Sequence, residues 1–100
     1  MLTMNISASK FIKVRMRMTN SICTLLVDSG ADISIFQLRN IDPQQRINER
    51  IKTKLTGINE GEIETLALTE TVLEFGNNVY TKHNFHLVNS NFPIPTDGIL

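Results

Sequence analysis

The residue best suited to chemistry is Asp28, which follows the apolar run 22–27 and precedes Ser29 and Gly30. Asp, Ser and Gly are all turn formers, so the simplest interpretation is a turn that ends a buried strand. The alternative is a catalytic carboxylate that works with a second carboxylate. When two such groups share one site their pKa values separate, and one can act as acid while the other acts as base. The tripeptide alone does not decide, because most such tripeptides are turns.

The residues around Asp28 favour the catalytic interpretation. Residues 25–34 read LLVDSGADIS and resemble the active-site signature of the retropepsin family of aspartic proteases, Asp-Thr/Ser-Gly-Ala-Asp after apolar residues. Two further segments resemble that family in the right order. Residues 55–59, LTGIN, look like its glycine-containing flap, and residues 93–100, PIPTDGIL, look like the approach to its second apolar segment. In detail the chain is most similar to proteases of Ty3/gypsy-type retrotransposon polyproteins.

The resemblance implies a role for each matching residue. Asp28 would be the catalytic carboxylate, and Ser29 and Gly30 would support the active-site loop. The residues implied in substrate binding are Gly30, Ala31, Asp32, Thr56, Gly57 and Ile58. Because 100 residues hold one such aspartate motif, two-carboxylate hydrolysis of a polypeptide requires a second identical subunit, and hence a homodimer. One aspartate would activate water and the other would protonate the peptide carbonyl, with no metal or cofactor.

The chain departs from the family at its end. It stops at Leu100, before the glycine, the short helix and the interface strand that such proteases use for dimerisation. We therefore expect residues 1–100 to form a single retropepsin-like domain that is truncated at its C-terminus. The leading hypothesis is an endopeptidase that processes a retrotransposon Gag-Pol polyprotein. The alternative is a catalytically inactive, truncated or domesticated module that binds peptides or dimerises.

The elements that must position these residues alternate with a period of two. Residues 12–18 alternate apolar with basic side chains and predict a half-buried strand, and residues 22–27 predict a more deeply buried one. Further strands are expected at 33–36, 50–55, 72–75 and 79–88, with a tight turn at Gly76-Asn77-Asn78, a loop at 89–97 and an apolar run from Gly98. Residues 44–48 are ambiguous between a helical turn and irregular structure. The fold class is all-β, a small closed barrel-like acid protease fold with a flap hairpin.

The segment 57–61 contains two glycines and predicts the solvent-exposed tip of that hairpin. Folding the chain about Ile58 places Lys54 opposite Glu62 and Lys52 opposite Glu64. Opposite charges across two strands help to set the register.

Two other candidate sites are weaker. His83 and His86 have three-residue spacing, but on a strand they point to opposite faces and no acidic or cysteine cluster joins them, so we expect no metal site. Asp97 precedes Gly98, yet its surroundings do not repeat the pattern around Asp28. A turn is therefore expected at Asp97 rather than a second catalytic carboxylate.

Composition argues against some classes of partner. Ten basic and ten acidic residues cancel, so no net field steers the chain toward nucleic acid or an anionic membrane. A small nucleic-acid-binding barrel would need stacking aromatics, and the chain has one tyrosine and no tryptophan. Cys23 is the only cysteine and no apolar run reaches the length of a membrane span. We expect an intracellular, cytoplasmic protein, with virus-like particles as one setting.

Overall fold

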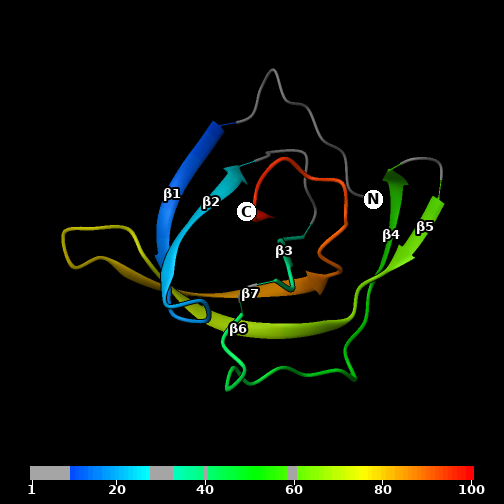
Figure 1. Cartoon of the computed structure of the whole chain (residues 1–100), viewed down its shortest axis with the longest axis horizontal. Coiled ribbons are helices and arrows are strands. Elements are labelled where there is room, and N and C mark those ends of the chain that lie inside the picture. Colours follow the sequence, from blue (N-terminus) through cyan, green and yellow to red (C-terminus); the bar gives the residue numbers. More distant parts are fainter. Residues whose placement is uncertain (1–9, 28–32, 40, 59–60) are drawn as a thin grey trace.

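The structure, a computed structural model, describes residues 10–27, 33–39, 41–58 and 61–100. Among them it contains eight strands and no helix: β1 (Lys10–Met16), β2 (Ser21–Val27), β3 (Ile35–Gln37), β4 (Lys54–Ile58), β5 (Gly61–Glu64), β6 (Ala67–Glu74), β7 (Tyr80–Val88) and β8 (Gly98–Ile99). Six strands close into a barrel in the order β1-β2-β8-β3-β7-β6, and β4 and β5 form a separate hairpin (Figure 1). This confirms the predicted all-β barrel with an additional hairpin. Within the described residues, no helix could cross a membrane.

The hairpin of β1 and β2 leads the chain to Asp28. The two strands pair antiparallel along their whole length, from Lys10 beside Val27 to Met16 beside Ser21. Alternate residues of the second half of β1 are buried, as the period-two pattern predicts. β2 runs to Val27, the residue that precedes the motif aspartate in the sequence.

The shortest strand lies in the middle of the barrel wall. β8 pairs parallel with β2 at Leu25 and Leu26 and antiparallel with β3. A Cβ atom on Gly98 would lie 2.6 Å from the carbonyl oxygen of Ile35 and 2.7 Å from Cδ1 of Phe36. Glycine at this position therefore allows β3 to lie directly against β8.

The long hairpin of β6 and β7 forms the opposite part of the wall. Its turn confirms the prediction, because Gly76, Asn77 and Asn78 have φ angles of 87°, 50° and 61°. Glycine and asparagine tolerate this left-handed region better than other residues do. β6 begins earlier than predicted, at Ala67.

Two groups of apolar residues fill the molecule. The barrel core consists of Val14, Met16, Met18, Cys23, Leu25, Phe36, Ala67, Leu73, Phe85 and Leu87. The second cluster consists of Leu26, Ile35, Leu55, Val88, Phe92 and Ile99, with the partly buried Ile33, Ile63 and Ile94 packed against it. Because neighbouring residues of a strand point to opposite faces, Leu25 enters the barrel core while Leu26 enters the second cluster.

Two local predictions were wrong. Residues 50–53 are not a strand, and β4 begins only at Lys54. In the hairpin, Lys54 lies opposite Glu64, and the register shifts between Leu55 and Ile58. The predicted partner of Lys54 was Glu62, so the predicted register was off by two residues. A shift of two keeps every side chain on its face, and Lys54 still reaches Glu62 diagonally, with 3.5 Å between Nζ and Oε1.

Candidate active site

The predicted catalytic motif lies outside the residues that the structure describes. Its positions remain predictions: Asp28, Ser29, Gly30, Ala31 and Asp32. The structure describes the frame on either side, which is Val27 at the end of β2 and the segment from Ile33 into β3. The geometry of this frame shows how the ends of the motif loop are held.

Both ends of the motif loop are fixed by β8. Ile99 pairs with Leu26 of β2 on one side and with Ile35 of β3 on the other. The strands that enter and leave the loop are therefore two strand spacings apart, which is about 10 Å. The amide of Leu100 continues the pairing and donates to the carbonyl oxygen of Leu26 at 2.8 Å. A short loop with both ends fixed in a sheet is a firm support for a reacting carboxylate.

Asp97 uses its carboxylate inside the barrel wall. Its Oδ2 accepts a hydrogen bond from the amide of Thr24 at 2.9 Å, and its own amide donates to the carbonyl oxygen of Thr24 at 3.0 Å. The carbonyl oxygen of Asp97 accepts from the amide of Gln37 at 2.9 Å. These contacts join β2 and β3 through the residue directly before β8, so the carboxylate of Asp97 has a structural role in the wall.

The segment after the motif is attached to β7 through Ser34. The Oγ of Ser34 lies 2.7 Å from Nε2 of His83, and its carbonyl oxygen accepts from the amide of His86 at 2.9 Å. The ring of His83 meets that of Phe85 edge to face, 4.9 Å between centroids. Burial lowers the pKa of both His83 and His86. The sequence offered no signal for this contact, because Ser34 and His83 are 49 residues apart.

The same two histidines, His83 and His86, are the pair for which the sequence predicted no metal site. Among the described residues, no group of three or more His, Cys, Asp and Glu side chains could hold a metal ion. His83 instead uses a ring nitrogen for Ser34.

The hairpin of β4 and β5 is attached at its base to the second cluster. Leu55 is buried there and Ile63 packs against it. Below the hairpin, the amide of Thr65 donates to the carbonyl oxygen of Thr53 and the amide of Thr53 donates to Oγ1 of Thr65, both at 2.8 Å. The three predicted flap residues, Thr56, Gly57 and Ile58, lie on β4 beyond this base. Their part in substrate binding stays a prediction.

The second cluster brings together the three segments that the sequence singled out. Ile33 directly follows the motif, Ile63 belongs to the hairpin, and Ile94 belongs to the loop before β8. They pack against one cluster although they come from distant parts of the chain. The arrangement places a hairpin and a loop beside the segment that leaves the motif.

Comparison with known proteins identifies the family. The model of a family described as retroviral aspartyl protease matches residues 9–100. The chain belongs to this family. It is also 41% identical, over 75 residues, to the retrovirus-related Pol polyprotein from transposon 412 of Drosophila melanogaster. Those residues are 75% of the chain but 6% of that polyprotein. The chain is thus a retroviral-type aspartyl protease domain, similar to a small part of a much longer relative, which confirms the resemblance seen in the sequence.

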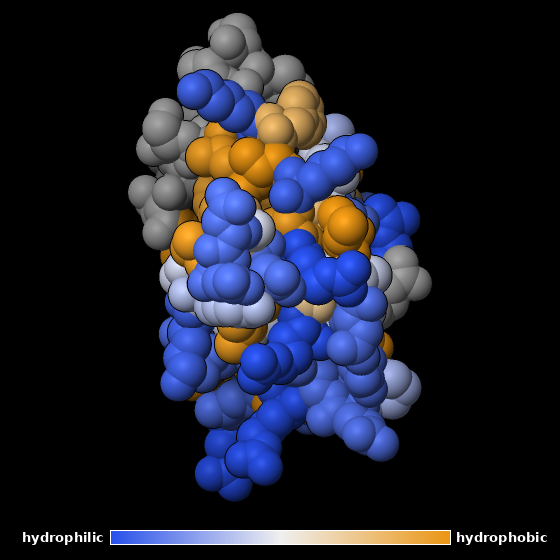
Figure 2. All heavy atoms as spheres, turned by 90° about the vertical axis from the view of Figure 1, so that its left-hand side faces the viewer, coloured by the Kyte–Doolittle hydropathy of each residue, from blue (hydrophilic) through white to orange (hydrophobic). Residues whose placement is uncertain are grey.

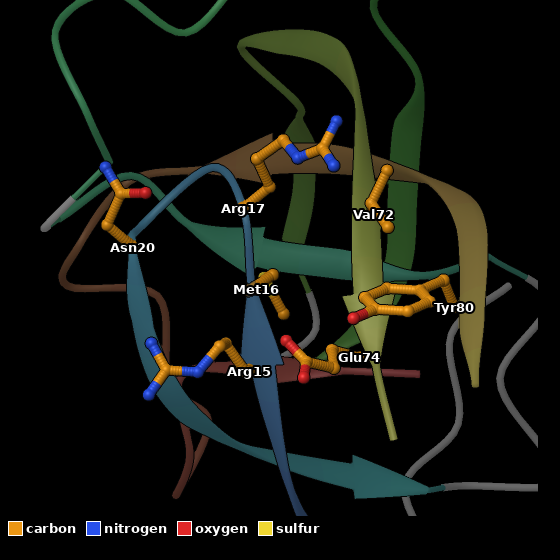
Figure 3. Close-up of a pocket in the computed structure, with 7 residues that line it drawn as sticks. All are labelled: Arg15, Met16, Arg17, Asn20, Val72, Glu74 and Tyr80. Atoms are coloured by element: carbon orange, nitrogen blue, oxygen red, sulfur yellow. The ribbon is translucent and has the colours of Figure 1, made fainter. Parts of the chain in front are cut away.

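A pocket elsewhere on this protease domain does not belong to the candidate site. It has a volume of about 180 Å³ and is lined by Arg15, Met16, Arg17, Asn20, Val72, Glu74 and Tyr80 (Figure 3). It lies at the turn end of the β1–β2 hairpin, whereas the motif follows the other end, about 20 Å of strand away. In Figure 3 the guanidinium of Arg17 points toward Val72, and that of Arg15 points away from Glu74.

The outer surface near the tip of the β6–β7 hairpin is mainly polar. Figure 2 looks onto that side and shows hydrophilic residues over most of it, with hydrophobic ones gathered in the upper half. Large apolar side chains that are exposed on the described part of the molecule include Ile22, Phe75 and Tyr80. Much of the surface of any folded domain is apolar, so exposed apolar side chains do not by themselves indicate a binding site.

Proposed function

We propose that this domain is an aspartic endopeptidase that hydrolyses peptide bonds with Asp28 from each of two identical subunits. Its substrate would be a retrotransposon Gag-Pol-like polyprotein, and it would act in the cytoplasm. The observation that carries the proposal is the pairing of β8 with both β2, which precedes the motif, and β3, which follows it, in a domain of the retroviral aspartyl protease family.

The chemistry needs two carboxylates close to each other. One ionised carboxylate takes a proton from water, and the water oxygen attacks the peptide carbonyl carbon. The other, protonated, carboxyl donates its proton to the carbonyl oxygen. On collapse of the tetrahedral intermediate, the first carboxyl passes the proton taken from water to the leaving nitrogen and the second carboxylate takes back a hydroxyl proton, which releases the amine and the new carboxylic acid. Like charges that share a site separate the two pKa values and make this division of roles possible. Each subunit has one such motif, so the site forms on the two-fold axis of a dimer.

The substrate would bind as an extended strand between the motif and the hairpin. The backbone of β4 near Thr56, Gly57 and Ile58 would add main-chain hydrogen bonds, in the manner of strand addition. Ile33, Ile63 and Ile94 are partly buried against the second cluster and give this region an apolar lining. We therefore expect a preference for apolar side chains beside the cleaved bond.

The test compares the parent chain with Asp28→Asn on a mixed peptide library at mildly acidic pH. The neutral amide cannot act as base, so we expect cleavage to fall by at least about 100-fold. Asp42→Asn is the matched control, because the carboxylate of Asp42 accepts hydrogen bonds from Nδ2 of Asn20 and the amide of Gln44, near the turn of the β1–β2 hairpin and away from the motif, and this variant should cleave like the parent. Mixing Asp28→Asn into the parent should also inhibit it, since mixed dimers lack one carboxylate. Equal cleavage by parent and Asp28→Asn would refute the proposal.

A further inference from the structure

A buried glutamine connects β3 to the loop that precedes β8. Gln37 is the last residue of β3 and only 3% of its surface is exposed. Its Nε2 donates to the carbonyl oxygen of Phe92 at 2.8 Å, across 55 residues of sequence. Its amide donates to the carbonyl oxygen of Asp97 at 2.9 Å. One residue therefore holds the loop both in its middle and at its end.

The same side chain carries a buried acceptor without a donor. Oε1 of Gln37 is inaccessible to solvent and accepts no hydrogen bond from any described residue. Such an atom loses its hydrogen bonds to water on folding and gains none in return, which is unfavourable. Methionine has a similar shape and would avoid this loss. Stability alone therefore does not explain why residue 37 has a side-chain amide rather than an apolar side chain of similar shape.

The loop that Gln37 holds has little support of its own. Pro93 and Pro95 have no amide hydrogen to donate. The backbone bonds within the loop are those from the amide of Phe92 to Asn89 at 2.9 Å and from the amide of Ile94 to Phe92 at 2.8 Å. The carbonyl oxygen of Phe92 lies between these turns, and Gln37 is its side-chain donor. This bond joins the middle of the loop to β3 of the barrel.

The position of the loop matters because of its neighbours. Phe92 is buried in the second cluster, and Ile94 packs against it together with Ile33 and Ile63. If the loop moved outward, Ile94 would move away from both the segment after the motif and the hairpin. In the proposed endopeptidase, this would change the apolar wall against which a peptide side chain packs.

We propose that Gln37 is a positioning residue that sets the loop 89–96, and with it the apolar side of the peptide site. The side-chain nitrogen Nε2 makes the positioning contact with the carbonyl oxygen of Phe92. In the orientation that this contact requires, Oε1 has no hydrogen-bond donor among the described residues. This inference rests on the proposed endopeptidase function. It predicts an effect on peptide binding that exceeds the effect on the chemical step.

The experiment compares Gln37→Met with Gln45→Met in the full chain, using one peptide that the parent cleaves. Gln45 is a matched control, because its Nε2 donates to Oγ1 of Thr69 at 2.7 Å and to the carbonyl oxygen of Glu70 at 2.9 Å, away from the loop. We expect Gln37→Met to raise KM by about fivefold or more with kcat within about twofold, and Gln45→Met to change neither. Equal KM values for Gln37→Met and the parent would overturn the proposal.

A third variant separates positioning from simple loss of packing. Gln37→Glu keeps the shape, but an ionised carboxylate cannot donate to Phe92, whereas a protonated one can. We expect its KM defect to shrink as the pH falls, because burial favours the protonated form. A defect in Gln37→Glu that is the same at every pH would contradict the assigned role of the donor.

A direct readout of the loop keeps this inference distinct from the proposed function. Hydrogen exchange at the amides of Phe92 and Ile94 should be faster in Gln37→Met than in Gln45→Met, whether or not the protein cleaves peptides. If the parent cleaves no better than Asp28→Asn, the endopeptidase proposal fails, and faster exchange would still support the hold of Gln37 on the loop. Unchanged exchange at both amides would overturn it.

Discussion

The barrel core and the second cluster are built differently. The barrel core takes nearly all its buried residues from barrel strands, and its boundary follows the barrel wall. The second cluster also includes Leu55 from the separate hairpin and Phe92 from the loop before β8, with three partly exposed isoleucines at its margin. One group closes the fold, while the other joins the barrel to the parts beside the motif. Apolar packing thus serves stability on one side and site assembly on the other.

Polar atoms follow the same division. In the barrel, the buried amide of Met18 donates to Oγ1 of Thr71 at 3.0 Å. The buried side-chain atoms that lack a partner within the described residues are Oε1 of Gln37 and Nδ1 of His86. Gln37 bonds to Phe92 of the second cluster, and His86 pairs with Ile35 of the same cluster. Among the described residues, incomplete hydrogen bonding of buried side chains is therefore found on β3 and β7, two strands that contribute to the second cluster.

The largest effect is expected from Gly98→Ala, because Gly98 lies on β8 between β2 and β3, and each of these two strands contributes residues to both groups. The added Cβ would overlap the Ile35 carbonyl oxygen and the Phe36 ring, so we expect a loss of about 3 kcal/mol or more in unfolding free energy. Gly76→Ala is the control, because nothing lies within 4 Å of its Cβ and only the φ of 87° is unfavourable, at about 1–2 kcal/mol. Urea unfolding measures both. Equal losses would mean that β8 is not tightly enclosed.

A pair of leucine substitutions compares the two groups directly. Leu25→Ala removes a fully buried side chain from the barrel core and should cost about 2–5 kcal/mol in urea unfolding. Leu55→Ala, in the hairpin, should cost less than half of that, because the hairpin lies outside the closed barrel and can adjust. It should raise KM for a cleaved peptide instead. If Leu55→Ala costs as much as Leu25→Ala, the hairpin is part of the cooperative core and the distinction fails.

The smallest expected effect concerns His83, which joins the segment after the motif to β7. Burial lowers its pKa in the folded state, so below the unfolded value of 6.5 the unfolded chain binds more protons than the folded one. Stability should therefore fall as the pH decreases through about 6.5 and change little above it. His83→Gln retains a polar partner for Ser34 without a titrating ring. Its urea midpoint should change less than that of the parent between pH 7.5 and 5.5, and identical slopes would show that His83 is not responsible.

Local patterns predicted the barrel strands well. The alternation in residues 12–18 and the apolar run 22–27 predicted β1 and β2, since period-two burial reflects side chains on opposite faces. The turn at Gly76-Asn77-Asn78 was predicted because few other residues accept positive φ. The prediction of a strand at residues 50–53 was wrong, because alternation by itself does not provide a pairing partner. The strand begins only at Lys54.

The contacts that build the candidate site were mostly invisible in the sequence. The resemblance pointed to Asp28 and to the segments near Gly57 and Ile99, but not to the residues that hold them. Gln37 reaches Phe92 and Ser34 reaches His83 across about half the chain, and neither pair has a spacing that local periodicity records. The register of the β4–β5 hairpin was also predicted wrongly. The sequence between these strands does not specify the position of the turn as closely as Asn77 and Asn78 specify the turn between β6 and β7.

The central place of β8 links the structure to the order in which the chain is synthesised. Thr24 and Asp97 bond to each other although they are 73 residues apart in sequence. At about 5–20 residues per second, a ribosome takes roughly 4–15 s to make that stretch. During this time β2 exists without β8, and so does β3 once it has been made, so the pairing that β8 provides to both strands is absent. The time that translation takes therefore delays formation of the candidate site until the residues of β8 have been made.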